Sequence, residues 1–330
     1  MKKVAINGLG RIGRAVFKMI HETDALELVA INDLVDPENL AYLINYDTVY
    51  GRYERKVEVE NDKIILNGME YRVYSEKDPA KLPWKDLKVD IVFECTGMFN
   101  TRKDLGKHIE AGARQVILSA PAKDDSVEMV VFGVNKPSGD NNIVSCASCT
   151  TNCIAPVVEI LDRYLGIQKA TLTTVHAYTS TQGIVDSPNK KIRRGRAAAA
   201  NFVPTTTGAT KATTKVLTQL DGKFEGSAIR GPVPVGSISD MNFVTGKAST
   251  KKEINDIFKK EARSERYKDI LSVNTEPLVS SDIIKDPSAS IVDLDMTMAI
   301  DGDLIKVMSW YDNEWGYAMQ MIRTAEYMDL

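Results

Sequence analysis

A turn built on three spaced glycines constrains the fold of this chain more than any other segment. Gly8, Gly10 and Gly13 of GLGRIG follow the apolar run KKVAIN and precede RAVFKMIHE, whose apolar side chains recur at helical spacing. The run ELVAIND then has the character of a second strand, and it ends in Asp33. A strand, a glycine turn, a helix and a second strand within about 30 residues form one supersecondary unit.

This spacing has a physical explanation, and it predicts a dinucleotide-binding fold of the Rossmann type. Gly8 permits the tight turn, Gly10 lets the backbone approach a pyrophosphate, and Gly13 lets the helix pack closely on the strand. The N-terminus of the helix offers free N–H groups to the phosphates. Asp33, twenty residues after Gly13 (33 − 13), can accept hydrogen bonds from an adenosine ribose and repel a 2′-phosphate, which favours NAD over NADP.

Later runs extend the same pattern. VDIVFECTG (89–97) and RQVILSAP (114–121) are typical of strands, and the helical segment RKDLGKHIEAGA lies between them. Alternating strands and helices predict a doubly wound parallel sheet, so we expect the α/β class. Cys95 lies in an almost entirely apolar strand, where we expect a buried and unreactive thiol.

Length and net charge limit the number of domains and the kinds of partner that we expect for this chain. The 330 residues leave room for two domains, and the net charge of −3 favours neither nucleic acid nor an anionic membrane as a partner. The start, MKKVAINGLG, does not resemble a signal peptide, and no apolar run approaches the roughly 18 residues of a membrane span. Four cysteines fit a reducing compartment, so we expect a cytoplasmic protein.

Three of the four cysteines, Cys146, Cys149 and Cys153, fall within VSCASCTTNCIAP. A structural zinc site normally needs a second pair of cysteine or histidine ligands. The chain has no second CxxC, and its three histidines are scattered, so we expect no metal. A redox couple between Cys146 and Cys149 remains an alternative.

A single nucleophile explains the cluster better. Ser148 is a good N-cap for the apolar-periodic helix that follows, which places Cys149 in the first turn. There the helix dipole and the free N–H groups stabilise a thiolate. Pro156 cannot donate a hydrogen bond within this helix, so we expect an irregular start or a kink. His176, at the end of the strand-like ATLTTVHAY, is the candidate base.

Five segments together resemble the phosphorylating glyceraldehyde-3-phosphate dehydrogenase family: INGLGRIGR, ASCTTNC, TTVHAYT, PTTTGATKA and SWYDNEWGY. The likeness runs in family order from residue 3 to about residue 325. It implies a Rossmann-type NAD-binding domain over 1–148, with a C-terminal helix over 313–330 that packs back on it. It also implies an α+β catalytic domain with a mixed or antiparallel sheet over 149–312.

The resemblance further implies a covalent mechanism. The Cys149 thiolate attacks the aldehyde of glyceraldehyde 3-phosphate to give a thiohemiacetal, and His176 accepts the hydroxyl proton. Hydride passes to NAD and leaves a thioester, which inorganic phosphate then releases as 1,3-bisphosphoglycerate. The family also implies a homotetramer.

The family's binding positions can be followed onto this chain. For the substrate phosphate they are Thr179 and Arg230, with Arg194 near both phosphates; for inorganic phosphate they are Ser148, Thr150, Thr207 and Gly208. The residues implied for NAD are Gly8, Gly10, Arg11, Ile12, Gly13, Asp33, Lys77, Ser119 and Asn313. Hydroxyls, backbone N–H groups and guanidinium groups are what phosphate recognition requires.

Three departures from the family pattern stand out. Cys146 occupies a position where many relatives have Asn, which raises the hypothesis that oxidation traps Cys149 with Cys146 or Cys153. The segment RGPVPVGS (230–237) stands where the family usually has RVPTPNVS; it keeps Arg230 but alters the strand that follows. Ser187 is polar where NAD-only relatives often have an apolar residue, so some use of NADP remains open.

Other functions remain as alternatives. An erythrose-4-phosphate dehydrogenase would share the nucleophile, the base and the cofactor fold, and a semialdehyde dehydrogenase would share the thioester chemistry. Thr179 and PTTTGAT favour the three-carbon substrate, and Arg230 favours a phosphate. A non-enzymatic binding protein on a dehydrogenase scaffold would have no chemical need of Cys149 or His176.

Overall fold

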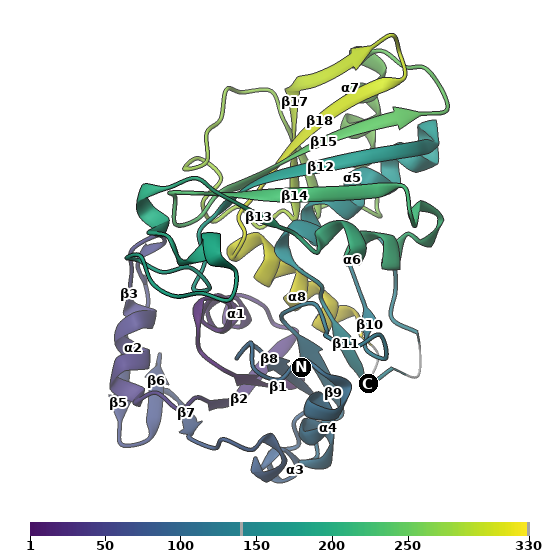
Figure 1. Ribbon diagram of the computed structural model, residues 1–330. Helices are drawn as coiled ribbons and strands as arrows, with labels where there is room; N and C mark the ends of the chain where they lie inside the picture. Colours follow the sequence, from purple (N-terminus) through teal and green to yellow (C-terminus); the bar gives the residue numbers. More distant parts are fainter. Residues whose placement is uncertain (139–140, 329–330) are drawn as a thin grey trace. The chain divides into compact units, whose positions relative to one another are not determined.

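The computed structural model describes residues 1–138 and 141–328, and these form two compact units (Figure 1). Unit 1 comprises Met1–Val130, Lys136–Ala147 and the end of the chain from Ala318. Unit 2 comprises Val131–Asn135 and Ser148–Tyr317. Compared with the predicted domains, unit 2 also includes 131–135, Ser148 and 313–317.

Unit 1 is built on a nine-stranded sheet in the order β10-β11-β9-β8-β1-β2-β7-β6-β5. The strands from β10 to β7 are parallel, and β7, β6 and β5 form an antiparallel meander at one edge. Its elements are β1 (Lys2–Asn7), α1 (Arg11–Ile20), β2 (Leu26–Asn32), α2 (Pro37–Asn45), β3 (Tyr46–Asp47), β4 (Gly51–Arg52), β5 (Val57–Glu60), β6 (Lys63–Leu66), β7 (Met69–Tyr74), α3 (Trp84–Leu87), β8 (Ile91–Glu94), α4 (Arg102–Glu110), β9 (Gln115–Leu118), β10 (Glu128–Met129) and β11 (Ile143–Ser145).

The order of the strands confirms the predicted doubly wound, Rossmann-type sheet. β1 lies between β2 and β8, so the chain winds outward in both directions from β1. In open parallel sheets, ligands bind at the carboxyl ends of the strands where the winding direction reverses. In this unit that point is the end of β1, directly before the glycine turn.

Unit 2 contains a seven-stranded mixed sheet in the order β13-β14-β12-β15-β18-β17-β16. β12 pairs with β14 and β16 pairs with β17 in parallel, and the other neighbours are antiparallel, which confirms the expected mixed sheet. Its elements are α5 (Cys149–Leu165), β12 (Ile167–Ala177), β13 (Val203–Thr206), α6 (Ala209–Val216), β14 (Phe224–Gly231), β15 (Ser237–Thr245), α7 (Lys251–Glu261), β16 (Leu271–Asn274), β17 (Ser290–Ile300) and β18 (Leu304–Tyr311).

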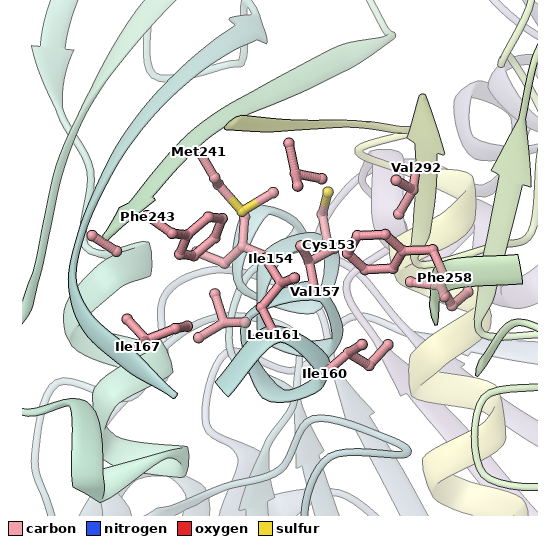
Figure 2. Packing of buried hydrophobic residues seen from close by; sticks show 14 of the residues in the cluster. Cys153, Ile154, Val157, Ile160, Leu161, Ile167, Met241, Phe243, Phe258 and Val292 are labelled. Atoms are coloured by element: carbon pink, nitrogen blue, oxygen red, sulfur yellow. The ribbon is translucent and has the colours of Figure 1, made fainter. Parts of the chain in front are cut away.

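Helix α5 is the central packing element of unit 2. Its side chains Ile154, Val157 and Leu161 are fully buried and lie among residues of β15 and α7, including Phe243 and Phe258 (Figure 2). Burying an aliphatic or aromatic side chain of this size stabilises the fold by about 1.5–3 kcal/mol. This packing fixes the helix, and therefore its first residue, against the sheet.

The start of α5 has an unusual backbone. The helix continues through the buried Pro156, so the proline does not end it. Directly before the N-cap, Ala147 has a φ of 55°, in the left-handed region that alanine rarely adopts. A residue held in such a conformation costs on the order of 1–3 kcal/mol, and conformations of this kind cluster at functional sites.

The last helix, α8, spans Trp315–Tyr327 within the segment 313–330 predicted as helical; residues 329 and 330 lie outside the described part. Its C-terminal end contacts the first strand within unit 1. The Nζ of Lys2 donates to the carbonyl oxygens of Ala325 and Glu326 at 2.8 and 2.9 Å. None of the helices formed by the described residues has the length and hydrophobicity to cross a membrane.

Candidate active site

Cys149 is the first residue of α5. The Oγ of Ser148 caps the helix by accepting a hydrogen bond from the backbone N–H of Thr151 at 3.1 Å. The N–H groups of Thr150 and of Cys149 itself face the Cys149 sulfur, and the side chain is half-buried. A sulfur at this position is held by a helix N-terminus and remains partly accessible.

His176 approaches this sulfur from β12. Its Nε2 lies 3.3 Å from the Cys149 Sγ, and its Nδ1 lies 2.7 Å from the carbonyl oxygen of Ala177. Arg230 is paired with His176 across the parallel strands β12 and β14. One guanidinium nitrogen of Arg230 lies 2.6 Å from Nδ1 and donates to the Ala177 oxygen at 3.0 Å. Three residues distant in the sequence thus meet at one point of unit 2.

The protonation of this group follows from its surroundings. Burial, and then the charge of Arg230, lower the pKa of His176 to about 3, so the ring is neutral near pH 7. Nδ1 faces the Ala177 carbonyl, which can only accept, and an Arg230 nitrogen, which can only donate. We place the ring proton on Nδ1 because a base must present the lone pair of Nε2 to the Cys149 thiol. The pKa of Cys149 is raised overall, because burial outweighs the opposing effects of Arg230 and the helix N–H groups. The resting pair is a thiol beside a base.

Tyr311, at the end of β18, supports this site, although no spacing rule in the sequence assigned it a role. Its hydroxyl lies 2.8 Å from the Oγ1 of Thr150 and 2.9 Å from the Oγ1 of Thr174. Its ring meets the His176 ring edge-on, with centroids 5.9 Å apart. Burial raises the pKa of Tyr311, so the hydroxyl stays protonated and holds Thr150 in place.

Beside this pair, unit 2 carries cationic groups that have no carboxylate partner among the residues that the structure describes. The Nε of Arg194 donates to Thr205 Oγ1 at 3.0 Å, and its NH2 donates to the carbonyl oxygen of Thr206 at 3.4 Å. Burial, and then the charge of Arg230, lower the pKa of Arg194, so the two guanidinium groups lie close enough to repel. Lys191 also donates to Thr206, at 2.9 Å. Such an arrangement suits an anion.

The threonines predicted for phosphate binding lie on neighbouring loops of unit 2. The hydroxyls of Thr179 and Thr181 are 2.9 Å apart, and Thr181 also accepts from Arg194 at 3.5 Å. Thr207 and Gly208 directly precede α6, where Thr207 Oγ1 accepts from the N–H of Ala209 at 3.1 Å. These groups place hydroxyls and a helix start near the Arg194 side chain.

In unit 1, a pocket of about 520 Å³ lies where β1, β2, β7 and β8 end. Gly8 has a φ of +94°, and a Cβ there would lie 2.8 Å from the backbone nitrogen of Thr96. A Cβ at Gly13 would lie 1.9 Å from the carbonyl oxygen of Gly8, whereas the space around Gly10 is open. The turn therefore fits a dinucleotide: two glycines are required by packing and one leaves room for the phosphates.

The remaining residues predicted for the cofactor divide into two groups. Asp33 and Lys77 line the pocket, and the Asp33 carboxylate accepts from the N–H of Leu9 at 2.6 Å. The described residues that line this pocket do not include Arg11, Ile12, Gly13 or Ser119; Arg11 instead forms an ion pair with Asp47. The other residues lining the pocket are Asn7, Gly8, Gly10, Asn32, Leu34, Glu76, Cys95, Thr96, Met98 and Phe99.

A buried polar network lies beneath this pocket, and no sequence pattern predicted it. Glu94 is fully buried, and its carboxylate accepts from the N–H of Thr96 at 2.8 Å, from Asn7 at 2.5 Å and from His108 Nε2 at 3.1 Å. The indole N–H of Trp84 donates to His108 Nδ1 at 3.0 Å, which assigns the ring proton to Nε2. The network holds Asn7 and Thr96, two residues that line the pocket.

The other cysteines differ from Cys149. Cys146 and Cys153 are buried, and burial raises the pKa of each thiol to about 12, so both are poor nucleophiles. Cys153 lies in the core of unit 2 (Figure 2). Cys95 is partly exposed because it lines the unit 1 pocket, so the expectation of a buried thiol is wrong there. Oxidative trapping of Cys149 stays a hypothesis.

Two protein-family models match this chain, and each falls largely in one of the two units. The model of the glyceraldehyde 3-phosphate dehydrogenase NAD binding domain matches residues 2–102, and that of the C-terminal domain of the same enzyme matches residues 148–313. The chain belongs to the glyceraldehyde-3-phosphate dehydrogenase family. The predicted resemblance is therefore confirmed, and so is the NAD-binding domain in unit 1.

Curated relatives extend the match over almost the whole chain. The chain is 48% identical over 324 residues to glyceraldehyde-3-phosphate dehydrogenase 2 of Streptomyces avermitilis, covering 97% of this chain and 96% of the relative. It is 48% identical over 330 residues to the Thermotoga maritima glyceraldehyde-3-phosphate dehydrogenase, covering 99% and 98%. The Geobacillus stearothermophilus enzyme is 46% identical over 329 residues, with the same coverage. The likeness to the family thus covers nearly all of the chain.

Proposed function

We propose that this member of the glyceraldehyde-3-phosphate dehydrogenase family catalyses the NAD-dependent, phosphorylating oxidation of glyceraldehyde 3-phosphate to 1,3-bisphosphoglycerate. The observation that carries the proposal is the Cys149 sulfur at the start of α5, 3.3 Å from His176 Nε2 and beside Arg230 and Arg194, which pair with no carboxylate in the described part of the chain. The names of the curated relatives support the same substrate.

Binding of the substrate relies on the cationic side of the site. Arg230 and Thr179 hold the phosphate of glyceraldehyde 3-phosphate, and Arg194 adds a second guanidinium group. This arrangement places the aldehyde carbon next to the Cys149 sulfur. Holding the reacting atoms together in this way supplies a large part of the rate enhancement.

The first half of the reaction oxidises the aldehyde. The Cys149 sulfur attacks the carbonyl carbon while His176 Nε2 takes the thiol proton and returns it to the carbonyl oxygen, which gives a thiohemiacetal. The N–H of Cys149 stabilises the developing oxyanion. His176 then removes the hydroxyl proton as hydride leaves the carbon, and a thioester remains on sulfur. The nicotinamide ring of NAD would accept this hydride.

The second half releases the product. Inorganic phosphate, held by Ser148, Thr150, Thr207 and Gly208, attacks the thioester carbonyl through one oxygen. The carbon–sulfur bond breaks, and Cys149 leaves as a thiolate that takes back a proton from His176. The thioester retains the free energy of the oxidation and transfers it to the acyl phosphate.

The residues that would hold NAD are Gly8, Gly10, Arg11, Ile12 and Gly13 of the glycine turn, Asp33 and Lys77 of the unit 1 pocket, and, from the family positions, Ser119 and Asn313. The Asp33 carboxylate disfavours the 2′-phosphate of NADP, although Ser187 leaves some NADP use open. We further propose that the protein works in the cytoplasm as a homotetramer, in two domains near 1–148 and 149–312, without nucleic-acid or membrane partners.

One assay tests the proposal. Purified protein is mixed with glyceraldehyde 3-phosphate, NAD and phosphate or arsenate, and NADH is followed at 340 nm, a standard readout of the reduced nicotinamide. Parallel reactions use NADP, and erythrose 4-phosphate as the alternative substrate. We expect the triose phosphate and NAD to be the preferred pair. Faster reduction with erythrose 4-phosphate would replace this function by the alternative, and no NADH with either sugar would favour a binding protein.

A further inference from the structure

The side-chain amide of Asn313 has a defined orientation. Its Oδ1 accepts from the backbone N–H of Gly236 at 3.1 Å and from the Oγ of Ser237 at 2.9 Å. A backbone N–H can only donate, so the amide atom that faces it must be the oxygen. The Nδ2 donors of Asn313 are therefore directed away from the start of β15.

Ser237 connects this asparagine to the base. Its Oγ accepts from the backbone N–H of Ala177 at 3.1 Å, and the Ala177 carbonyl oxygen lies 2.7 Å from His176 Nδ1. A hydroxyl has a single proton, and Asn313 Oδ1 can only accept, so the proton points to Asn313 and a lone pair faces Ala177. Ser237 is fully buried, and both of its hydrogen-bonding roles are fixed by its neighbours.

The turn before Ser237 is built to hold this arrangement. Gly236 has a φ of +95°, and a Cβ there would lie 2.3 Å from the carbonyl oxygen of Ser280. Only glycine fits without a shift of the backbone. The segment RGPVPVGS, in which this chain departs from the usual family pattern, therefore preserves a specific geometry: an N–H and a hydroxyl directed at one side-chain oxygen.

We infer that Ser237 is a positioning residue that orients two parts of the site at once. It holds the Asn313 amide with its Nδ2 donors turned away from β15, where they would be available to NAD, and it anchors the Ala177 peptide that fixes the His176 ring. The cofactor role of Asn313 rests on the proposed function. Without the hydroxyl, the Asn313 amide loses one of its two donors, and the buried Ala177 N–H loses its acceptor.

The test compares Ser237→Ala with Ser239→Ala, a change two positions along the same face of β15 at an equally buried serine, whose hydroxyl faces Cys153 and contacts neither Asn313 nor the Ala177 peptide. Dissociation constants for NAD come from calorimetry, and KM and kcat come from the NADH assay. Loss of one hydrogen bond predicts a rise in the dissociation constant and KM for NAD of about 2- to 13-fold for Ser237→Ala. We expect NAD binding by Ser239→Ala to stay within about two-fold of the wild type, because this hydroxyl touches neither of the groups that Ser237 holds.

A double-mutant cycle shows whether Ser237 acts through Asn313. In the Asn313→Ala background, Ser237→Ala should no longer change NAD binding, since the two residues act as one unit. Additive effects, or equal effects of Ser237→Ala and Ser239→Ala, would overturn the inference. Ser237→Cys, which preserves size, replaces the alanine variant if that variant does not fold. Ser237→Thr keeps the hydroxyl group and should bind NAD like the wild type. Calorimetry needs no turnover, so failure of the proposed reaction would appear separately, as a wild-type protein that binds NAD but forms no NADH.

Discussion

Two buried histidines, one in each unit, show what separates a structural from a reactive imidazole in this protein. His108 is fully buried, and both of its ring nitrogens have fixed partners, the indole of Trp84 and the carboxylate of Glu94. His176 is almost as buried, but its Nε2 faces the partly exposed sulfur of Cys149, and Arg230 stands beside its Nδ1. The same side chain is bound into a closed network in one unit and directed at a nucleophile in the other.

The comparison teaches that burial alone does not identify a catalytic histidine. The group that faces Nε2 decides the role. At Glu94, a carboxylate that already accepts several hydrogen bonds faces the histidine and completes a structural network. At Cys149, a thiol at the start of a helix faces the histidine, and the Nε2 lone pair can accept the thiol proton. We therefore expect substitution of His176 to reduce mainly activity, and substitution of His108 to reduce mainly stability.

The largest expected effect is on turnover. His176→Asn removes the base while Cys149 remains, so kcat for NADH formation should fall by about 10²–10⁴-fold. His108→Asn, the matched change in unit 1, should leave kcat of the folded protein within a few-fold of the wild type. A loss of less than ten-fold in His176→Asn, or an equal loss in both variants, would contradict the comparison.

The next effect is on stability, where substitution of His108 should have a larger effect than substitution of His176. His108→Ala leaves the buried Glu94 carboxylate without one of its donors and the Trp84 indole N–H without its acceptor, and each unsatisfied buried group costs about 1–3 kcal/mol. We expect the free energy of unfolding in urea to fall by this order for His108→Ala and by less for His176→Ala. Replacing Glu94 by Gln together with His108→Ala should recover part of the loss, since the uncompensated charge is removed. Equal destabilisation by the two alanine variants would show that the networks do not differ.

The smallest effect concerns pH. The pKa of His176 is lowered from 6.5 to about 3 on folding, so between these values the unfolded chain binds more protons than the folded one. The stabilisation from the neutral ring is complete above pH 6.5 and is lost as the pH falls, by at most about 1.4 kcal/mol per pH unit for one proton. Urea unfolding between pH 6.5 and 4.5 should therefore show a shallower decline for His176→Asn than for the wild type. Parallel declines would mean that His176 titrates normally in the folded protein.

The two units also differ in how far the sequence could predict them. The glycine turn of unit 1 was predictable because its reasons are local: Gly8 and Gly13 contact each other within one turn, and Asp33 follows on the next strand. The start of α5 was predictable for the same reason, from Ser148 as an N-cap beside Cys149.

The partners of these residues depend on contacts between distant strands, which no local pattern encodes. Arg230 reaches His176 because β12 and β14 pair in parallel at that register, and Tyr311 reaches Thr150 from β18. The network around Glu94 and the partial exposure of Cys95 arise in the same way, from how strands and helices end beside one another. Their residue types carry no spacing signature.

The central claim is that Cys149 carries the acyl group, and the mass of the acyl-enzyme tests it most directly. Enzyme with glyceraldehyde 3-phosphate and NAD, but without phosphate, is quenched in acid and digested. We predict a 3-phosphoglyceroyl adduct on the peptide that contains Cys149. The adduct should disappear when phosphate is added before the quench, and it should be absent from Cys149→Ser. NADH formation with no adduct on Cys149, or with the adduct on another residue, would contradict the account.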